Sequence, residues 1–265
     1  MDNSQISKAA NILYNSRMNL KRIEKLPEDC NPDSLEDSYL IQNKLAEKYL
    51  SSKKENFIIG IKIGCTNKAA QEQINVKEPF FGNIFSDNIS KSDCIINSKK
   101  YFNPFVEPEF SFLMKDSLDI VKAPFGSDEI LKNINAVLPS IEIVDSRYND
   151  WTSVGIKQLV ADNAVHAHWV YANENNNLNS FNFNNHEVNL YINSKLIEKG
   201  NSRNVMKNPI NSLTWLINKL ASKGKTLPKN FYISTGTCTK AIPINKGDEI
   251  FADFGSLGKV NFFYK

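Results

Sequence analysis

The chain changes from a helical to a β pattern at residues 57–64, FIIGIKIG. Every second position of this stretch is apolar, which is the two-residue period of a strand. Upstream, residues 34–37 (SLED) resemble a helix-capping box, because the Ser34 side chain can accept a hydrogen bond from the Asp37 amide. Three apolar residues then recur at a spacing of four, as on one face of a helix: Ile41, Leu45 and Tyr49.

Beyond residue 64 the chain has mostly strand character. Five stretches combine strand-forming residues with flanking turn residues, and they cover residues 104–114, 137–145, 186–192, 230–234 and 249–264. One late helix is expected over residues 209–223, with Pro209 near its start and Gly224 after its end. The Asn-rich run 173–185 is expected to form a surface loop or a hairpin with a mobile tip.

These patterns predict an α+β protein. We expect a helical N-terminal part over residues 1–56 and a β-rich catalytic domain over residues 57–265. Strands and helices do not alternate regularly along the chain, which argues against a doubly wound parallel sheet.

Composition excludes several classes of protein. The chain has 265 residues with a net charge of +3, and its basic residues are scattered, so we expect no nucleic-acid partner. No run of apolar residues is long enough for a membrane span, and the first residues lack the pattern of a secretory signal. The four cysteines are far apart and form no Cys-x-x-Cys, so free thiols in a reducing cytoplasm are expected.

Two acids share one face of the strand predicted over residues 104–114. Glu107 and Glu109 are two positions apart, so both side chains project to the same side, about 7 Å apart at the backbone. Like charges about 4 Å apart repel by about 4 kcal/mol at an effective dielectric constant of ~20, and a cation between them turns repulsion into binding. The alternative is an exposed edge strand with solvated acids, which Pro108 would suit.

A third acid favours the metal-site interpretation. Glu142 lies between Ile141 and Ile143 in the strand predicted over residues 137–145, and a carboxylate inside an apolar strand needs a cationic partner. That partner is either an Arg or Lys side chain or a metal ion. Three carboxylates suit Mg²⁺ or Mn²⁺, whereas Zn²⁺ normally takes His or Cys ligands.

Lys62 is unusual within its Ile- and Gly-rich strand. Gly60 and Gly64 lie two residues to either side on the same face, so we expect open space around the ammonium where a ligand can approach. Lys62 with a lowered pKa would act as an acid or base, and a charged Lys62 would bind a carboxylate. The structural alternative is a salt bridge to an acid of the fold.

Two further groups of polar residues have spacings that suit a ligand site. Ser234, Thr235, Gly236 and Thr237 follow a predicted strand, and such a turn suits a loop whose amides face an anion. His166 and His168 are spaced to share a strand face, but no third His or Cys is nearby, so we expect core or surface histidines there.

The chain resembles the 2-keto-4-pentenoate hydratase and 4-oxalocrotonate decarboxylase family, within the fumarylacetoacetate hydrolase fold. The similar segments occur in order along most of the chain, at residues 34–42, 60–66, 81–82, 107–109, 141–147, 150–151, 160–164, 234–236, 247–248 and 254–258. The resemblance implies a twisted mixed β-roll core with a helical N-terminal part, and a homo-oligomer.

The resemblance also implies roles for individual residues. It makes Glu107, Glu109 and Glu142 the metal ligands, Lys62 a catalytic residue, and Gly64 with residues 234–237 contacts of the substrate.

Two positions depart from the family pattern. Many relatives have an acid in the loop before the Phe-Gly pair, where this chain has Lys77 or Phe80, so Glu78 is the remaining candidate for proton transfer. Val165 stands where some relatives have a small or hydroxyl residue.

The expected activity is hydration of a 2-hydroxy-2,4-dienoate or 2-oxo-enoate during catabolism of small aromatic-derived acids. The alternatives are a 4-oxalocrotonate-type decarboxylase, an acylpyruvate hydrolase, and a non-catalytic subunit that supports a related pathway enzyme.

Overall fold

The computed structural model describes residues 1–73 and 76–265. Its helices are α1 (Asn3–Met18), α2 (Leu35–Ser52), α3 (Lys68–Gln73), α4 (Ser127–Lys132), α5 (Ile156–Ala161) and α6 (Pro209–Ala221). The predicted capping box at the start of α2 is confirmed, because the Ser34 side chain accepts a hydrogen bond from the Asp37 amide. The predicted late helix is α6, with Pro209 at its first turn.

The strands form two sheets. In the described residues the larger sheet has the order β2-β1-β10-β5-β6-β7-β3, with β11 paired to β5, and the smaller has the order β4-β13-β12-β8-β9. The strands of the larger sheet are β1 (Ile58–Gly64), β2 (Phe80–Phe85), β3 (Ile89–Lys91), β5 (Phe105–Met114), β6 (Ile134–Val144), β7 (His166–Tyr171), β10 (Tyr232–Thr237) and β11 (Ile242–Pro243). Those of the smaller sheet are β4 (Cys94–Ile96), β8 (Glu187–Ile192), β9 (Lys195–Asn201), β12 (Glu249–Asp253) and β13 (Lys259–Tyr264).

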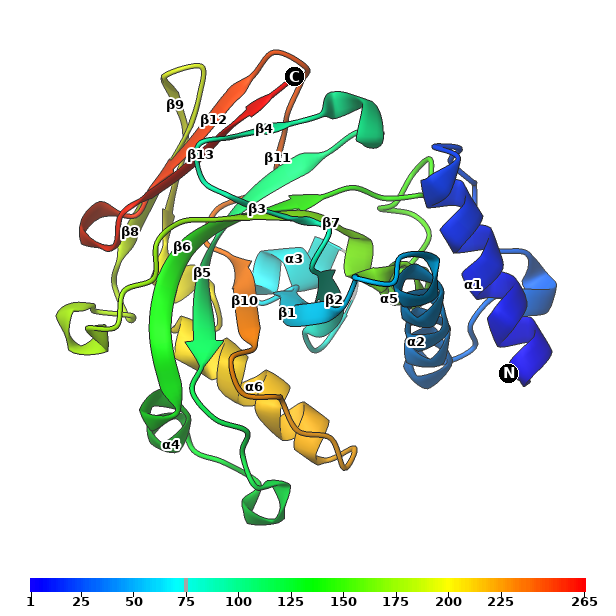
Figure 1. The fold of residues 1–265 in the computed structure, drawn as a ribbon, viewed down its shortest axis with the longest axis horizontal. Coiled ribbons are helices and arrows are strands. Elements are labelled where there is room, and N and C mark those ends of the chain that lie inside the picture. Colours follow the sequence, from blue (N-terminus) through cyan, green and yellow to red (C-terminus); the bar gives the residue numbers. More distant parts are fainter. Residues whose placement is uncertain (74–75) are drawn as a thin grey trace.

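The larger sheet curls around α6 (Figure 1). Its long central strands β5 and β6 curve through the middle of the molecule, while α1 and α2 pack at one side. The helix α6 lies against β10, where the Ser212 hydroxyl donates to the carbonyl of Thr235 at 2.8 Å. A curled mixed sheet with N-terminal helices is the α+β architecture that the sequence predicts.

Strands form in all the predicted stretches, but the structure also has strands that were not predicted, namely β2, β3, β4, β9 and β11. Two further differences concern the candidate site. β10 extends through Thr237, so residues 235–237 continue the strand rather than form a loop after it. The strand β7, which contains both His166 and His168, was not among the predicted strands. The Asn-rich run 173–185 has no strand, but Asn175 forms an isolated antiparallel bridge to Val137, and Leu178–Ser180 is a short 3-10 turn, which fits the predicted loop.

The N-terminal helices share an apolar cluster with the β-rich part. In that cluster Leu13 of α1 and Ile41 of α2 join Phe85, Val144 and other body residues. The proposed domain boundary between residues 56 and 57 stays a prediction. Among the described helices, none is both long and apolar enough to cross a bilayer.

Candidate metal centre

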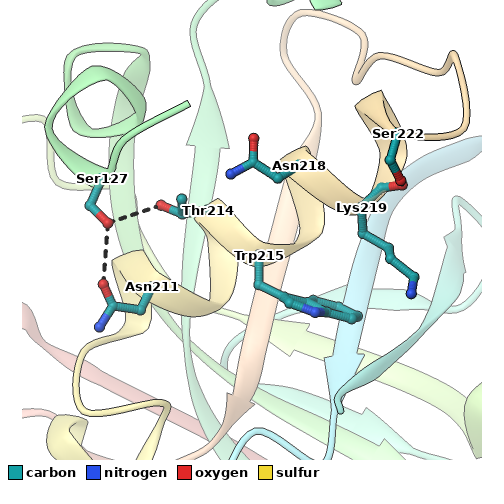
Figure 2. A pocket seen from close by; sticks show the side chains of 7 residues that line it. All are labelled: Ser127, Asn211, Thr214, Trp215, Asn218, Lys219 and Ser222. Carbon is teal, nitrogen blue, oxygen red and sulfur yellow. Dashed lines mark hydrogen bonds between the residues drawn. The ribbon is translucent and has the colours of Figure 1, made fainter. Parts of the chain in front are cut away.

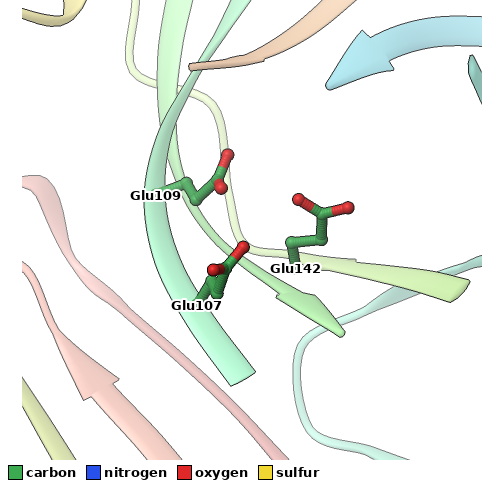
Figure 3. Close-up of side chains that lie close together, drawn as sticks. All are labelled: Glu107, Glu109 and Glu142. Carbon is green, nitrogen blue, oxygen red and sulfur yellow. The ribbon is translucent and has the colours of Figure 1, made fainter. Parts of the chain in front are cut away.

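The pairing of β5 with β6 brings three glutamates together. Glu107 lies directly opposite Glu142 in the antiparallel register, and Glu109 is two residues along the same strand. One carboxylate oxygen from each of the three lies within 4.8 Å of the others. Figure 3 shows the three side chains converging from β5 and β6 on one space. The predicted trio is therefore assembled in the fold.

Neighbouring donors hold one oxygen of Glu109 and one of Glu142. Glu109 Oε2 accepts from the Ser234 hydroxyl at 2.6 Å and from the Gly236 amide at 2.9 Å. Glu142 Oε1 lies 3.2 Å from Lys62 Nζ and 2.8 Å from His166 Nδ1. The other oxygens, Glu109 Oε1 and Glu142 Oε2, are buried and have no hydrogen-bond partner among the described residues. Two orphaned carboxylate oxygens beside a third carboxylate fit a cation.

The electrostatics of the trio also favour a cation. Burial, followed by the charge of Glu142, raises the pKa of Glu107 to about 7. Burial likewise raises the pKa of Glu142 to about 7 and that of Glu109 well above its usual range. The three groups therefore resist ionising together at neutral pH unless a positive charge compensates them. Three oxygen ligands with room for water or substrate suit a hard divalent ion such as Mg²⁺.

Lys62 lies beside the carboxylates as a charged group. Burial lowers its pKa, but attraction to Glu142, Glu107 and Glu109 more than offsets this, so the pKa is raised above its ordinary value. Of the two chemical roles that the sequence left open, the structure favours the charged lysine over one with a lowered pKa. Lys62 can stabilise an anionic substrate while it orients Glu142.

The open space expected around Lys62 is filled. A Cβ added at Gly60 would lie 2.5 Å from the carbonyl oxygen of Tyr232, and one at Gly64 would lie 2.9 Å from the Phe80 ring. The expectation was wrong because glycine there allows close packing of β10 and β2 against β1 rather than leaving a gap. Whether Gly64 contacts a substrate stays a prediction.

The segment 234–237 holds Glu109. Ser234 and Gly236 donate to its carboxylate, whereas the Thr235 and Thr237 hydroxyls donate to the carbonyls of Phe110 and Thr239. Gly236 has a φ of +105°, and a Cβ there would lie 2.0 Å from the Thr66 hydroxyl oxygen, so only glycine fits. Contact of these four residues with a substrate carboxylate stays a prediction.

Glu78 is not brought to the trio in this structure. It is half-exposed, and its carboxylate oxygens lie 2.9 and 3.1 Å from Lys219 Nζ on α6. Lys219 also lines a surface hollow of about 490 Å³ on α6, with Trp215 and Ser222 among its neighbours (Figure 2). At the other end of this hollow, the Ser127 hydroxyl hydrogen-bonds the side chains of Asn211 and Thr214. The role of Glu78 in proton transfer stays a prediction.

Sequence reasoning missed His166 as a residue of the site. Burial, then the charges of Lys62 and Arg17, keep its pKa well below the usual range, so the ring is neutral and Nδ1–H donates to Glu142. The available signal was the His-x-His spacing, which predicts a shared strand face. The sequence predicts core or surface histidines at these positions, and His166 is indeed buried, but the pairing of β7 with β6 that places it against Glu142 is not visible in the sequence.

The hydrogen bond from His166 predicts an effect on metal affinity. The variant His166→Phe leaves Glu142 Oε1 without its imidazole donor, so we expect Mg²⁺ to bind about 10- to 100-fold more weakly. His168→Phe is the matched control, because His168 is also on β7 but its ring contacts Ser90. Calorimetric titration with Mg²⁺ measures both variants, and equal losses in the two would contradict this role for His166.

The raised carboxylate pKa values predict a pH-dependent stability of the metal-free protein. Glu107 has a folded pKa of about 7 against an ordinary 4.5, so its protonated form stabilises the fold below pH 4.5 and that stability is lost as the pH rises through 7. Without metal, Glu107→Gln should therefore melt above the native protein by a margin that grows between about pH 5 and pH 7. Thermal melting in EDTA measures the difference in melting temperature between the two proteins. The histidines are the same in both proteins, so their titration does not contribute to this difference. A margin independent of pH would contradict the assignment.

The chain is similar in sequence to two kinds of known enzyme. No family model matches the chain. It is 26% identical to a 4-oxalocrotonate decarboxylase of Pseudomonas putida over 98% of this chain and 97% of that protein. It is 27% identical to a 2-keto-4-pentenoate hydratase of Paraburkholderia xenovorans (strain LB400) over 98% of this chain and 95% of that protein.

Solved structures show the same fold. A 4-oxalocrotonate decarboxylase from Pseudomonas putida G7, complexed with magnesium and adipate, superposes with a TM-score of 0.93 and 25% identity, covering 100% of this chain and 99% of that one. A fumarylacetoacetate hydrolase family protein from Yersinia pestis CO92 matches with a TM-score of 0.56 at 13% identity, over 77% of this chain and 92% of that one. The chain is therefore a relative of the 4-oxalocrotonate decarboxylases and 2-keto-4-pentenoate hydratases, and it has the fumarylacetoacetate hydrolase-like fold.

Proposed function

We propose that the chain is a Mg²⁺-dependent hydratase that adds water to a 2-hydroxy-2,4-dienoate by way of its 2-oxo-3-enoate form. The observation that carries the proposal is the trio of the buried Glu109 and Glu142 and the half-buried Glu107, with charged Lys62 against it. Three ionised carboxylates and one ammonium leave two negative charges, which one divalent cation neutralises. Mn²⁺ has the same charge and the same ligand preference and is the alternative ion.

The residues of the site suit chemistry that passes through an enolate. A divalent ion held by the three carboxylates would supply Lewis acidity toward the carboxylate and adjacent carbonyl of a 2-oxo acid. Lys62 adds a fixed positive charge for the oxygen on which the enolate charge develops. Ser234 and Gly236 keep Glu109 oriented, and His166 and Lys62 keep Glu142 oriented. The 2-oxo group draws electrons from C4 of the enoate, so water adds at that carbon.

The second candidate is decarboxylation of a 4-oxalocrotonate-type 2-oxo acid. It is favoured by the TM-score of 0.93 to a 4-oxalocrotonate decarboxylase over the whole chain. In that reaction the conjugated 2-oxo group accepts the electron pair released as CO₂ leaves the far end of the substrate, and the enolate is the product of this step. An acylpyruvate hydrolase and a non-catalytic subunit that supports a pathway enzyme rank below both.

One pair of assays tests the assignment. The protein is supplied with 2-hydroxypenta-2,4-dienoate and Mg²⁺, and loss of the diene absorbance is followed, with EDTA as the control. The same preparation is given 4-oxalocrotonate, and CO₂ is measured. We expect Mg²⁺-dependent loss of the diene. No turnover of the dienoate together with CO₂ release would reverse the order of the two candidates.

We further propose a cytoplasmic homo-oligomer that associates with a related pathway enzyme. Its four cysteines are free, as in a reducing compartment. Ile95 of β4 and Phe263 of β13 are paired neighbours in the smaller sheet, and 68% and 39% of their respective surfaces are exposed. Exposed adjacent apolar side chains favour a subunit contact. Light scattering after size-exclusion chromatography measures the subunit number.

A further inference from the structure

A cavity of about 260 Å³ lies between the N-terminal helices and the β-rich part. The ends of α1 and α2 form one side of it, and the segments that follow β4 and β6 form the other, together with Ala167 of β7. The glutamate trio and Lys62 do not line it. Successive side chains of a strand face opposite sides, so Ala167 faces this cavity while His166 faces Glu142. The cavity is therefore separate from the metal centre.

Arg17 places a cation in the lining of this cavity. Its guanidinium is half-buried, and Cζ lies 5.7 Å from the centre of the Tyr49 ring, which is also part of the lining. Nη2 donates to the carbonyl oxygen of His166. In the part of the chain that the structure describes, Arg17 forms no ion pair, and its other N–H groups have no acceptor. A planar guanidinium with N–H groups to spare suits a carboxylate, which can accept two parallel hydrogen bonds.

Two charged pairs at the cavity cancel. Lys53 Nζ lies 2.5 Å from a carboxylate oxygen of Asp87, and both residues line the cavity. Arg147, which also lines it, lies with Nε 2.5 Å from Asp162 Oδ1, and its Nη2 donates to the Asp162 carbonyl. The third nitrogen, Nη1, is buried without a hydrogen-bond partner in the described residues. A ligand that accepted from Nη1 would satisfy a donor that these residues leave unmatched.

The other charges of the lining favour one anion. Asp145 is the acid of the lining outside these pairs, and its two oxygens accept from the backbone amides of Phe102 and Asn103 at 3.0 and 2.9 Å. Arg17 and Lys100 are the two cations outside the pairs. Two cations against one acid leave a single positive charge, which a monoanion neutralises.

Aromatic side chains lie between these charges. Tyr49, Tyr101 and Phe102 all line the cavity. Burial raises the pKa of Tyr49 to about 12 and also raises that of Tyr101, so both tyrosines are uncharged at neutral pH. Three aromatic side chains beside a cation suit a ligand with a flat apolar body and one charged end.

We propose that this cavity is a second ligand site, which binds a small monocarboxylate with an apolar body the size of one ring. Arg17 and Lys100 bind the carboxylate, and the aromatic side chains pack against the body. The inference does not depend on the proposed function, because no residue of the glutamate trio lines the cavity.

Three small probes test the inference in the native protein. Benzoate has the ring and the charge, benzamide has the ring without the charge, and acetate has the charge without the ring. The full chain is titrated with each by calorimetry, once with Mg²⁺ and once in EDTA. We expect benzoate to bind with a Kd below about 1 mM in both conditions, and the other two at least about 10-fold more weakly.

Three results of these titrations would overturn the proposal. The first is no binding of benzoate. The second is binding of benzamide or acetate as tight as that of benzoate, because the cavity would then not select for both charge and ring. The third is benzoate binding that requires Mg²⁺, because it would place the ligand at the metal centre.

Variants of the two cations assign the binding to this cavity. Arg17→Met keeps a long side chain without the guanidinium and should weaken benzoate binding at least about 10-fold. Lys100→Met should weaken it about 3-fold, and Lys99→Met is the matched control, because Lys99 is exposed on the same turn, Ser98–Lys100, but does not line the cavity. Unchanged benzoate affinity in a folded Arg17→Met protein contradicts the assignment. If thermal melting shows that Arg17→Met is misfolded, equal affinities in the two lysine variants contradict it instead.

Discussion

Replacing Glu109 with Gln is expected to lower turnover more than about 1000-fold and Mg²⁺ affinity more than about 100-fold while the fold is retained. Glu109 Oε1 is a buried oxygen without a hydrogen-bond partner in the described residues, so it is available to a cation. A neutral amide of the same size is a poor ligand for a hard ion. The Gln oxygen can still accept from Ser234 and Gly236, which preserves the local structure. Calorimetric titration with Mg²⁺ and the dienoate assay measure the two losses.

The same variant should be more stable than the native protein when metal is absent. Burial and the charges of Glu142 and Glu107 raise the pKa of Glu109 well above its usual range. The substitution therefore removes a buried carboxyl group whose ionisation destabilises the metal-free fold. Glu187→Gln is the matched control, because Glu187 is an exposed glutamate on β8. Mg²⁺ binding by Glu109→Gln within about 3-fold of the native value would show that Glu109 is not a ligand.

Replacing Lys62 with Met is expected to lower turnover more than about 100-fold while Mg²⁺ binds at least as tightly as in the native protein. The ammonium lies 3.2 Å from Glu142 Oε1, so its removal leaves the trio more negative and more attractive to a cation. Substrate loses a fixed positive charge at the same time. A loss of turnover without a loss of Mg²⁺ affinity distinguishes Lys62 from the metal ligands, because replacing a ligand lowers both turnover and Mg²⁺ affinity.

Stability supplies a second signature of Lys62. Without metal at neutral pH, Lys62→Met should melt below the native protein, because the trio loses its compensating charge, and added Mg²⁺ should restore most of the difference. Lys195→Met is the control, because Lys195 is exposed on β9. Native turnover by Lys62→Met would instead indicate that the lysine is only part of a structural salt bridge.

Features encoded locally could be predicted from the sequence. The capping box at Ser34 and the apolar face of α6 depend on residues three or four positions apart. The shared face of Glu107 and Glu109 follows from the two-residue period of a strand, and it too is found in the structure.

Features that depend on pairing between distant segments could not be derived from local pattern. Glu142 reaches Glu107 only because β5 and β6 pair in one register, and a shift by one residue would turn one of them away. The family resemblance assigned these residues to one site. The sequence pattern alone did not decide whether the partner of Glu142 is a basic side chain or a metal ion.

The turn before β7 explains why His166 was missed. Asn163, Ala164 and Val165 all have φ values between 52° and 55°, a left-handed conformation that sequence rules assign mainly to glycine. The Asn163 side chain bonds both the amide and the carbonyl of Asn83, at 2.8 and 2.9 Å, and so ties this turn to β2. The turn leads directly into β7 and places His166 against Glu142. Without glycine at the turn, the sequence did not indicate where the strand begins.

A crystal structure of the protein with Mn²⁺ tests the central claim most directly, because Mn²⁺ gives an anomalous signal that identifies its position. We predict one anomalous peak between the carboxylates of Glu107, Glu109 and Glu142, with Glu109 Oε1 and Glu142 Oε2 among its ligands. A peak elsewhere, with the three carboxylates protonated and bonded to one another, would contradict the assignment of this trio as the metal centre.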